Sequence, residues 1–101
     1  MVIEFLTFGV NAGEREEWLA VDERTWSKFL ARQAGFVSKQ VWSDHCANGQ
    51  VHAMICWEDE ASWQAIPAEE LEAVEKSMGR WSRECTMKVF DVLKVVDADR
   101  A

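Results

Sequence analysis

One carboxylate in the first predicted helix stands where an apolar side chain is expected. A helical wheel at about 100° per residue gathers five apolar side chains in one arc, and Asp22 falls in the middle of it. The arc consists of Trp18, Leu19, Trp26, Phe29 and Leu30. Burial of an unpaired carboxylate is costly, so Asp22 must be protonated, hydrogen-bonded or facing a polar cavity.

Two interpretations of Asp22 remain open. Its partner could be an indole N–H, Thr7, Ser38 or Gln40, or Arg15, two turns earlier on the same line of the helix. Asp22 is then either a satisfied buried group that fixes the helix against the sheet, or a pocket carboxylate. In the second case it would be a general base or a hydrogen-bond anchor for a ligand.

The chain has six tryptophans and no tyrosine. Large rings at helical and strand spacing are usually core, but a buried indole N–H needs a partner, and several rings converge on the side of the sheet that Asp22 faces. Such a lining suits a flat aromatic or apolar guest. The predicted ligand-binding residues are Thr7, Trp26, Gln40, Trp42, Trp57 and Trp63.

Other constellations are weak. His52 and Cys56 are four residues apart on a strand, about 13 Å, which is too far to share a metal ion, so no metal site is expected. Neither a G-x-S-x-G motif nor a phosphate-binding glycine loop is present. Lys39, Lys88 and Lys94 are interpreted as solvated side chains.

Charge and cysteine usage restrict the partners and the compartment. The net charge of −7 repels phosphate backbones and anionic lipid, so neither nucleic acid nor a membrane is expected as a partner. Three cysteines without a C-x-x-C spacing fit reduced thiols, and no apolar run approaches the roughly 18 residues of a membrane span. These features favour a cytoplasmic protein.

The elements follow a strand, helix, strand, strand, helix, strand order. Strands are expected at 2–10, 36–44, 51–58 and 85–96, a long helix at about 14–33, a short helix up to Ile66 and another from Pro67. Residues 1–96 form a single domain, and 97–101 are expected to be a frayed polar tail.

Asn48-Gly49 predicts a hairpin between the second and third strands. A two-residue turn there places Trp42 opposite Ile55 and Lys39 opposite Glu58, and a slip by two residues would change these partners but not the faces. The face expected under the helices carries Phe36, Ser38, Gln40, Trp42, Val51, Ala53, Ile55 and Trp57.

The strands carry apolar residues on both faces. Sheets with one wet face usually alternate apolar with polar residues, so helices should cover one face and a second copy of the chain the other. The predicted fold is α+β: a ferredoxin-like split βαβ with a four-stranded antiparallel sheet, pairing through its sheet face into a homodimer that forms a dimeric α/β barrel.

Short motifs over nearly the whole chain carry a family resemblance. They are Glu4-Phe5-Leu6-Thr7-Phe8, Trp18 with Asp22 and Trp26, Gly35-Phe36, Val41-Trp42, Trp57, Trp63-Gln64-Ala65-Ile66-Pro67 and Leu71 through Glu75. This pattern resembles an uncharacterised family of small proteins in the dimeric α/β-barrel superfamily, which also contains the antibiotic-biosynthesis monooxygenases. The resemblance implies ferredoxin-like monomers that pair sheet to sheet, each with a cavity between helices and sheet.

The resemblance implies an activity only in outline. Haem-degrading relatives use an asparagine on the first strand and a histidine on the second helix. This chain has Thr7 at that strand position and no histidine within 59–81, so no cofactor is expected. Cofactor-free monooxygenases of the superfamily bind aromatic substrates beside tryptophan and polar side chains.

The leading hypothesis is therefore a homodimer that binds a small apolar or aromatic molecule in a Trp-lined cavity and could oxidise it without a cofactor, with Asp22 as base or anchor. The alternatives are a non-catalytic binding or sensing module and a purely structural dimer.

Overall fold

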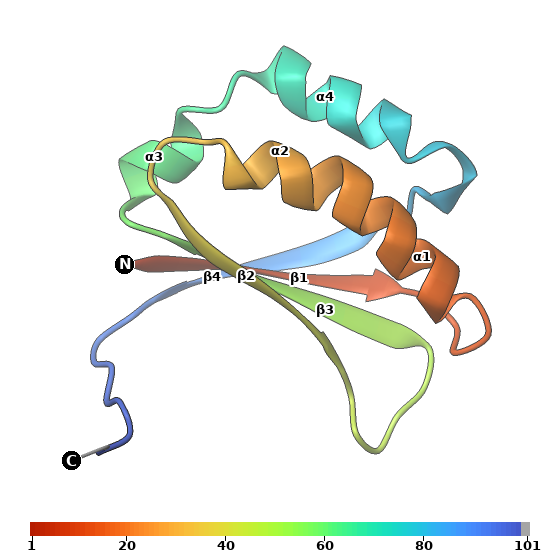
Figure 1. Ribbon diagram of the computed structural model, residues 1–101, viewed down its shortest axis with the longest axis horizontal. Coiled ribbons are helices and arrows are strands. Elements are labelled where there is room, and N and C mark those ends of the chain that lie inside the picture. The colour runs from red at the N-terminus through yellow and green to blue at the C-terminus, as the bar shows by residue number, and fades with distance from the viewer. Residues whose placement is uncertain (100–101) are drawn as a thin grey trace.

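The computed structural model describes residues 1–99 (Figure 1). Its four strands form one antiparallel sheet in the order β2-β3-β1-β4. The elements in chain order are β1 (Val2–Gly9), α1 (Arg15–Asp22), η1 (Glu23–Ser27), α2 (Lys28–Ala31), β2 (Phe36–Ser43), β3 (Gln50–Trp57), α3 (Glu60–Gln64), α4 (Ala68–Ser77), η2 (Gly79–Trp81) and β4 (Cys85–Asp91). This arrangement confirms the predicted ferredoxin-like α+β fold.

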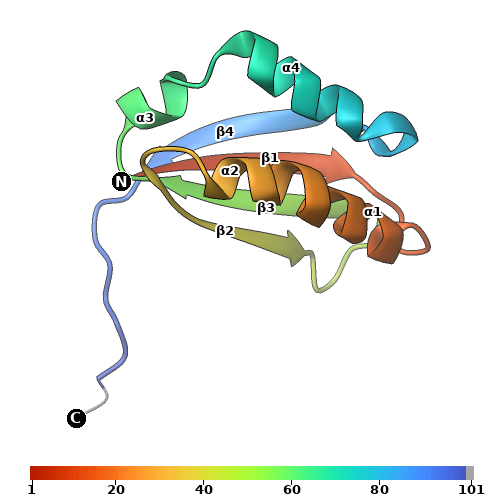
Figure 2. The ribbon, with the colours of Figure 1, turned by 45° about the horizontal axis from the view of Figure 1, so that its top comes forward.

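All the helices lie on the same side of the sheet, and nothing in residues 1–99 covers the opposite face (Figures 1 and 2). The covered face holds two apolar clusters. One is built on Val10, Trp18, Val21, Val51 and Met78, and the other on Leu30, Ile55 and Trp57. Within the described residues, no helix combines the length and apolarity that a membrane crossing requires.

The helical segment after β1 is not one uniform α-helix as predicted. It contains a π-helical stretch, η1, where the Thr25 hydroxyl donates to the Val21 carbonyl at 2.7 Å. A π-turn inserts a residue and rotates the following helix face, so a wheel with a uniform 100° step is not valid across it. Leu19 precedes η1, but the predicted arc that included it was drawn with Trp26, Phe29 and Leu30, whose positions η1 alters. Leu19 is 36% exposed.

The second helical region also follows local signals. The Asp59 carboxylate caps α3 by accepting from the Ser62 backbone N–H at 2.8 Å. Pro67, with ψ at 139°, separates α3 from α4, and Glu69 and Glu70 lie in the first turn of α4, as the sequence predicts.

The predicted hairpin register is wrong. The structure places Trp42 opposite His52 and Lys39 opposite Ile55. The strands are joined by the loop 44–49 instead of a two-residue turn, and a β-bulge lies between Phe36 and Ser38. The pairing therefore differs by an odd number of residues, and an odd shift exchanges the faces. Lys39 and Val41 lie under the helices, whereas Ser38, Gln40 and Trp42 lie on the opposite face.

β4 ends at Asp91, so the prediction of a strand up to Val96 is wrong for its last part. Val2, the first residue of β1, pairs with Asp91, and the Val92 N–H donates to the Met1 carbonyl at 2.9 Å. No partner strand remains beyond that bond, so residues 92–99 leave the sheet (Figure 1). Of the predicted tail, residues 100–101 lie outside the described part of the chain.

Candidate functional site

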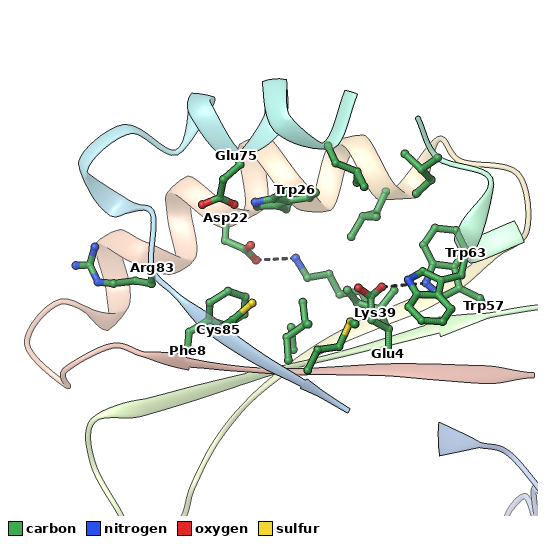
Figure 3. Close-up of a pocket in the computed structure, with 17 residues that line it drawn as sticks. Glu4, Phe8, Asp22, Trp26, Lys39, Trp57, Trp63, Glu75, Arg83 and Cys85 are labelled. Carbon is green, nitrogen blue, oxygen red and sulfur yellow. Dashed lines mark hydrogen bonds and ion pairs between the residues drawn. The ribbon is translucent and has the colours of Figure 1, made fainter. Parts of the chain in front are cut away.

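A cavity of about 340 Å³ lies between the helices and the covered face of the sheet (Figure 3). The lining is mostly apolar, with a few ionisable groups. It consists of Glu4, Leu6, Phe8, Asp22, Trp26, Leu30, Lys39, Ala53, Ile55, Trp57, Trp63, Ile66, Leu71, Glu75, Arg83, Cys85 and Met87. Leu71 on α4 and Met87 on β4 are 36% and 52% exposed, so the cavity opens between these two elements.

Asp22 is buried, and its partner is Lys39. The Lys39 Nζ atom lies 2.7 Å from Asp22 Oδ2 and 2.9 Å from Ser27 Oγ. The two charged side chains are only 8% and 6% exposed. Lys39 is therefore not the solvated residue that the sequence suggested, because the bulge in β2 turns it toward the helices. The same pair lines an open groove beside Leu19 on its outer side.

Arg15, the ion-pair partner that the sequence suggested for Asp22, forms no bond with it among residues 1–99. Its Nε and Nη2 atoms are buried and have no hydrogen-bond partner among residues 1–99. The indole N–H of Trp18 also has no hydrogen-bond partner among residues 1–99, and its ring packs in the core against Phe8. These two side chains are absent from the cavity lining.

Glu4 is a cavity residue that the sequence analysis did not select. Burial raises the pKa of its carboxyl group. This effect outweighs the hydrogen bonds from Trp57 and Trp63 and the charge of Lys39, all of which favour the carboxylate. The Trp57 Nε1 atom donates to Glu4 Oε1 at 3.2 Å. The sequence did carry a signal for this residue, since Glu4 is the one charged residue in the otherwise apolar strand predicted at 2–10.

The structure brings together four of the predicted site residues and separates three. Asp22, Trp26, Trp57 and Trp63 line the cavity. Thr7, Gln40 and Trp42 lie on the opposite sheet face, where Thr7 Oγ1 is 2.9 Å from His52 Nδ1 and Trp42 Nε1 donates to Gln40 Oε1 at 2.9 Å. Gln40 and Trp42 were misplaced because the register of β2 differs from the predicted one, and Thr7 because it lies on the face of β1 that points away from the helices.

A second group of polar residues lies at the α4 and β4 end of the cavity (Figure 3). Arg83 contacts Glu14 at 3.4 Å and donates to the Arg80 carbonyl at 2.9 Å, and Glu75 accepts from the Ser82 hydroxyl. Partial burial, with the charges of Glu75 and Glu4, raises the pKa of the Cys85 thiol, which disfavours the nucleophilic thiolate. Among residues 1–99, no cluster of three or more His, Cys, Asp or Glu side chains could hold a metal ion.

The sheet order and the single helical layer are those of the ferredoxin-like fold found in solved structures of antibiotic-biosynthesis-monooxygenase-like proteins. Solved structures share this fold over nearly the whole chain, which confirms the fold expected from the sequence resemblance. No protein-family model matches the sequence, and no curated protein is significantly similar to it.

Three of the similar structures have named activities. The monooxygenase ActVA-Orf6 of Streptomyces coelicolor, in complex with nanaomycin D, has a TM-score of 0.79 and 10% identity, over 97% of this chain and 92% of that one. SnoaB, a cofactor-independent oxygenase of Streptomyces nogalater, has a TM-score of 0.70 and 18% identity, over 96% and 98%. The heme-degrader MhuD of Mycobacterium tuberculosis has a TM-score of 0.74 and 17% identity, over 96% and 100%.

Proposed function

We propose that this protein binds a small, largely apolar or aromatic molecule in the cavity between its helices and its sheet. The observation that carries the proposal is the cavity itself, about 340 Å³ in volume, with an apolar lining and a charged pair at its wall. Trp26, Trp57 and Trp63 contact the guest. Asp22 acts as an anchor for the guest through Lys39, because it holds the Lys39 ammonium group in place at the cavity wall.

Cofactor-independent oxidation is the activity proposed for this site. Two of the similar structures are a cofactor-independent oxygenase and a monooxygenase bound to nanaomycin D, which supports a related chemistry on the same fold. Haem is not proposed as the guest. The lining residues, all within 1–99, include no histidine, and the thiol of Cys85 is disfavoured as a thiolate ligand.

We also propose that the chain forms a homodimer through the uncovered face of the sheet. Trp42 and Phe90 are 43% and 50% exposed there, and both rings contact Phe5 at centroid distances of 5.9 and 6.2 Å. An apolar patch of this kind on a small domain marks an interface. The extended segment 92–96 carries exposed Leu93, Val95 and Val96, and it would pack on the partner.

The free thiols of all three cysteines support a cytoplasmic location.

Oxygen uptake and ligand binding together test this function. A panel of small aromatic compounds is screened by tryptophan fluorescence, and each compound that binds is followed with an oxygen electrode. Oxygen uptake that is lost in Asp22→Asn while binding persists supports an enzyme. Binding without oxygen uptake supports a sensing module, and a lack of binding by every compound contradicts the proposal.

A further inference from the structure

Glu4 and Lys39 lie on one straight rung of the sheet. Glu4 pairs with Ile55 across β1 and β3, and Lys39 pairs with the same Ile55 across β3 and β2. Neighbouring strands lie about 4.8 Å apart, so the Cα atoms of Glu4 and Lys39 are roughly 10 Å apart. All three side chains line the cavity. An apolar floor therefore separates a carboxyl group from an ammonium group.

The Lys39 ammonium group is fixed but has a donor to spare. Asp22 Oδ2 and Ser27 Oγ take two of its three N–H donors, and no other side chain or carbonyl within residues 1–99 accepts the third. An ammonium held in this way in an apolar cavity favours an oxyanion on the ligand.

Glu4 has the complementary property. The indole N–H groups of Trp57 and Trp63 donate to its carboxyl group and favour the charged form, but burial outweighs them and raises the affinity of Glu4 for a proton. Burial, which raises the pKa of this carboxyl group, makes it a stronger base than a solvated glutamate.

We propose that the cavity takes a weakly acidic hydroxyl compound, a phenol or an enol, from which Glu4 accepts the hydroxyl proton while the Lys39 ammonium group holds the resulting oxyanion. The inference rests on the proposed function, because it names the ligand class and the proton acceptor of the same cavity. The ligand O–H bond breaks, the proton moves to a Glu4 carboxylate oxygen, and the electron pair stays on the ligand oxygen. This step requires no oxidant or reductant.

The remaining ionisable groups of the cavity lie toward its other end. These are Glu75, which accepts from Ser82, Arg83, which is held by Glu14 and two backbone carbonyls, and Cys85. Figure 3 shows Glu75, Arg83 and Cys85 near the Asp22 end of the Asp22–Lys39 pair and Glu4, Trp57 and Trp63 beyond its Lys39 end. Within residues 1–99, neither Glu75 nor Arg83 is bonded to Glu4, so Glu4→Gln leaves the contacts of both in place.

The test uses 4-nitrophenol, whose phenolate is coloured, at a pH where the free probe is mostly protonated. The bound probe should show the phenolate spectrum in the wild-type protein. Calorimetry in two buffers of different ionisation enthalpy should show little proton release, because Glu4 takes the proton. In Glu4→Gln, which keeps an acceptor for Trp57, the proton should instead be released to the buffer.

The paired substitution Asp22→Leu with Lys39→Met removes the cation without leaving a buried charge. The pKa of the bound probe should then rise by about one unit or more, a tenfold change in its ionisation constant. Equal proton release from the wild type and Glu4→Gln, or a phenolate spectrum unchanged by the paired substitution, would overturn the inference.

Two further probes separate this inference from the proposed function. 4-Nitroanisole cannot ionise, so its binding to the wild type reports occupancy of the cavity without proton transfer. If it binds while 4-nitrophenol stays neutral in the cavity, only this inference fails. If neither probe binds, the proposed function fails with it. Preferential, Glu4-dependent binding of 4-nitrobenzylamine would identify Glu4 as a counter-ion for a cation and overturn its role as a proton acceptor.

Discussion

At the scale of single residues, two carboxylates share one cavity and have different partners. Asp22 is paired with the ammonium group of Lys39, whereas Glu4 has indole N–H donors and a raised pKa. Two carboxyl groups in contrasting environments can take different roles, one as a fixed charge and one as a proton carrier. The π-helical turn contributes to this division because it directly follows Asp22 and contains Ser27, the second acceptor of Lys39.

The Asp22–Lys39 pair predicts a strong non-additivity in stability. Asp22→Leu alone leaves a buried ammonium group unpaired and should lower the free energy of unfolding by about 3–5 kcal/mol. Adding Lys39→Met should restore most of the loss, because an apolar pair of similar volume replaces the ion pair. Urea unfolding of the two single variants and the double variant measures this. Additive losses in the double variant would show that the side chains are not coupled.

Glu4 predicts a pH dependence of a definite sign. Since folding raises the pKa of Glu4 above its ordinary value of 4.5, the native state keeps this proton at pH values where the unfolded chain has lost it. The contribution of Glu4 to stability therefore falls as pH rises through the window above 4.5. Glu4→Gln should remove this fall and stabilise the protein at neutral pH by up to about 1 kcal/mol. Unfolding free energies from pH 4 to 7 test it, and a slope identical in both proteins would contradict it.

At the scale of elements, the sequence was sufficient for element types and order but not for strand faces. Apolar periodicity and caps such as Asp59 located the helices and strands. The register of β2 against β3 depends on a bulge near Val37 and a loop longer than Asn48-Gly49 suggests, and neither has a clear sequence signal. Because the predicted register was wrong by an odd number of residues, Lys39 was assigned to the uncovered face and Gln40 and Trp42 to the face under the helices. Thr7 was misplaced separately, on β1.

The turn into β2 predicts a severe effect of a small substitution. Gly35 has a φ of +82°, and an added Cβ would meet the side chain of Ser62. Gly35→Ala should therefore destabilise the protein by about 2–4 kcal/mol, from backbone strain and overpacking together. Gly13→Ala, where no atom lies within 4 Å of the added Cβ, is the matched control and should change stability by less than about 0.5 kcal/mol. Similar melting temperatures for both variants would refute this explanation.

At the scale of the whole molecule, a single helical layer leaves half of a two-faced sheet uncovered. The apolar patch of Phe5, Trp42 and Phe90 predicts that a charge placed there breaks the proposed homodimer. Trp42→Glu should raise the dimer dissociation constant by about tenfold or more. Ala73→Glu, on the exposed side of α4, should not change it. Sedimentation equilibrium measures the dissociation constants of the wild type and both variants. A wild type that is monomeric at high micromolar concentration would contradict the proposed dimer.

Occupancy of the cavity by an apolar guest is tested most directly by calorimetric titration with 1-naphthol. Leu71 and Leu19 are both 36% exposed, but Leu71 lies at the mouth of the cavity and Leu19 faces the groove outside. The wild type and Leu19→Trp should bind one equivalent with equal affinity, and Leu71→Trp should bind about tenfold more weakly or worse. Absence of binding heat in the wild type, or equal binding by Leu71→Trp, would contradict a ligand-binding cavity at this position.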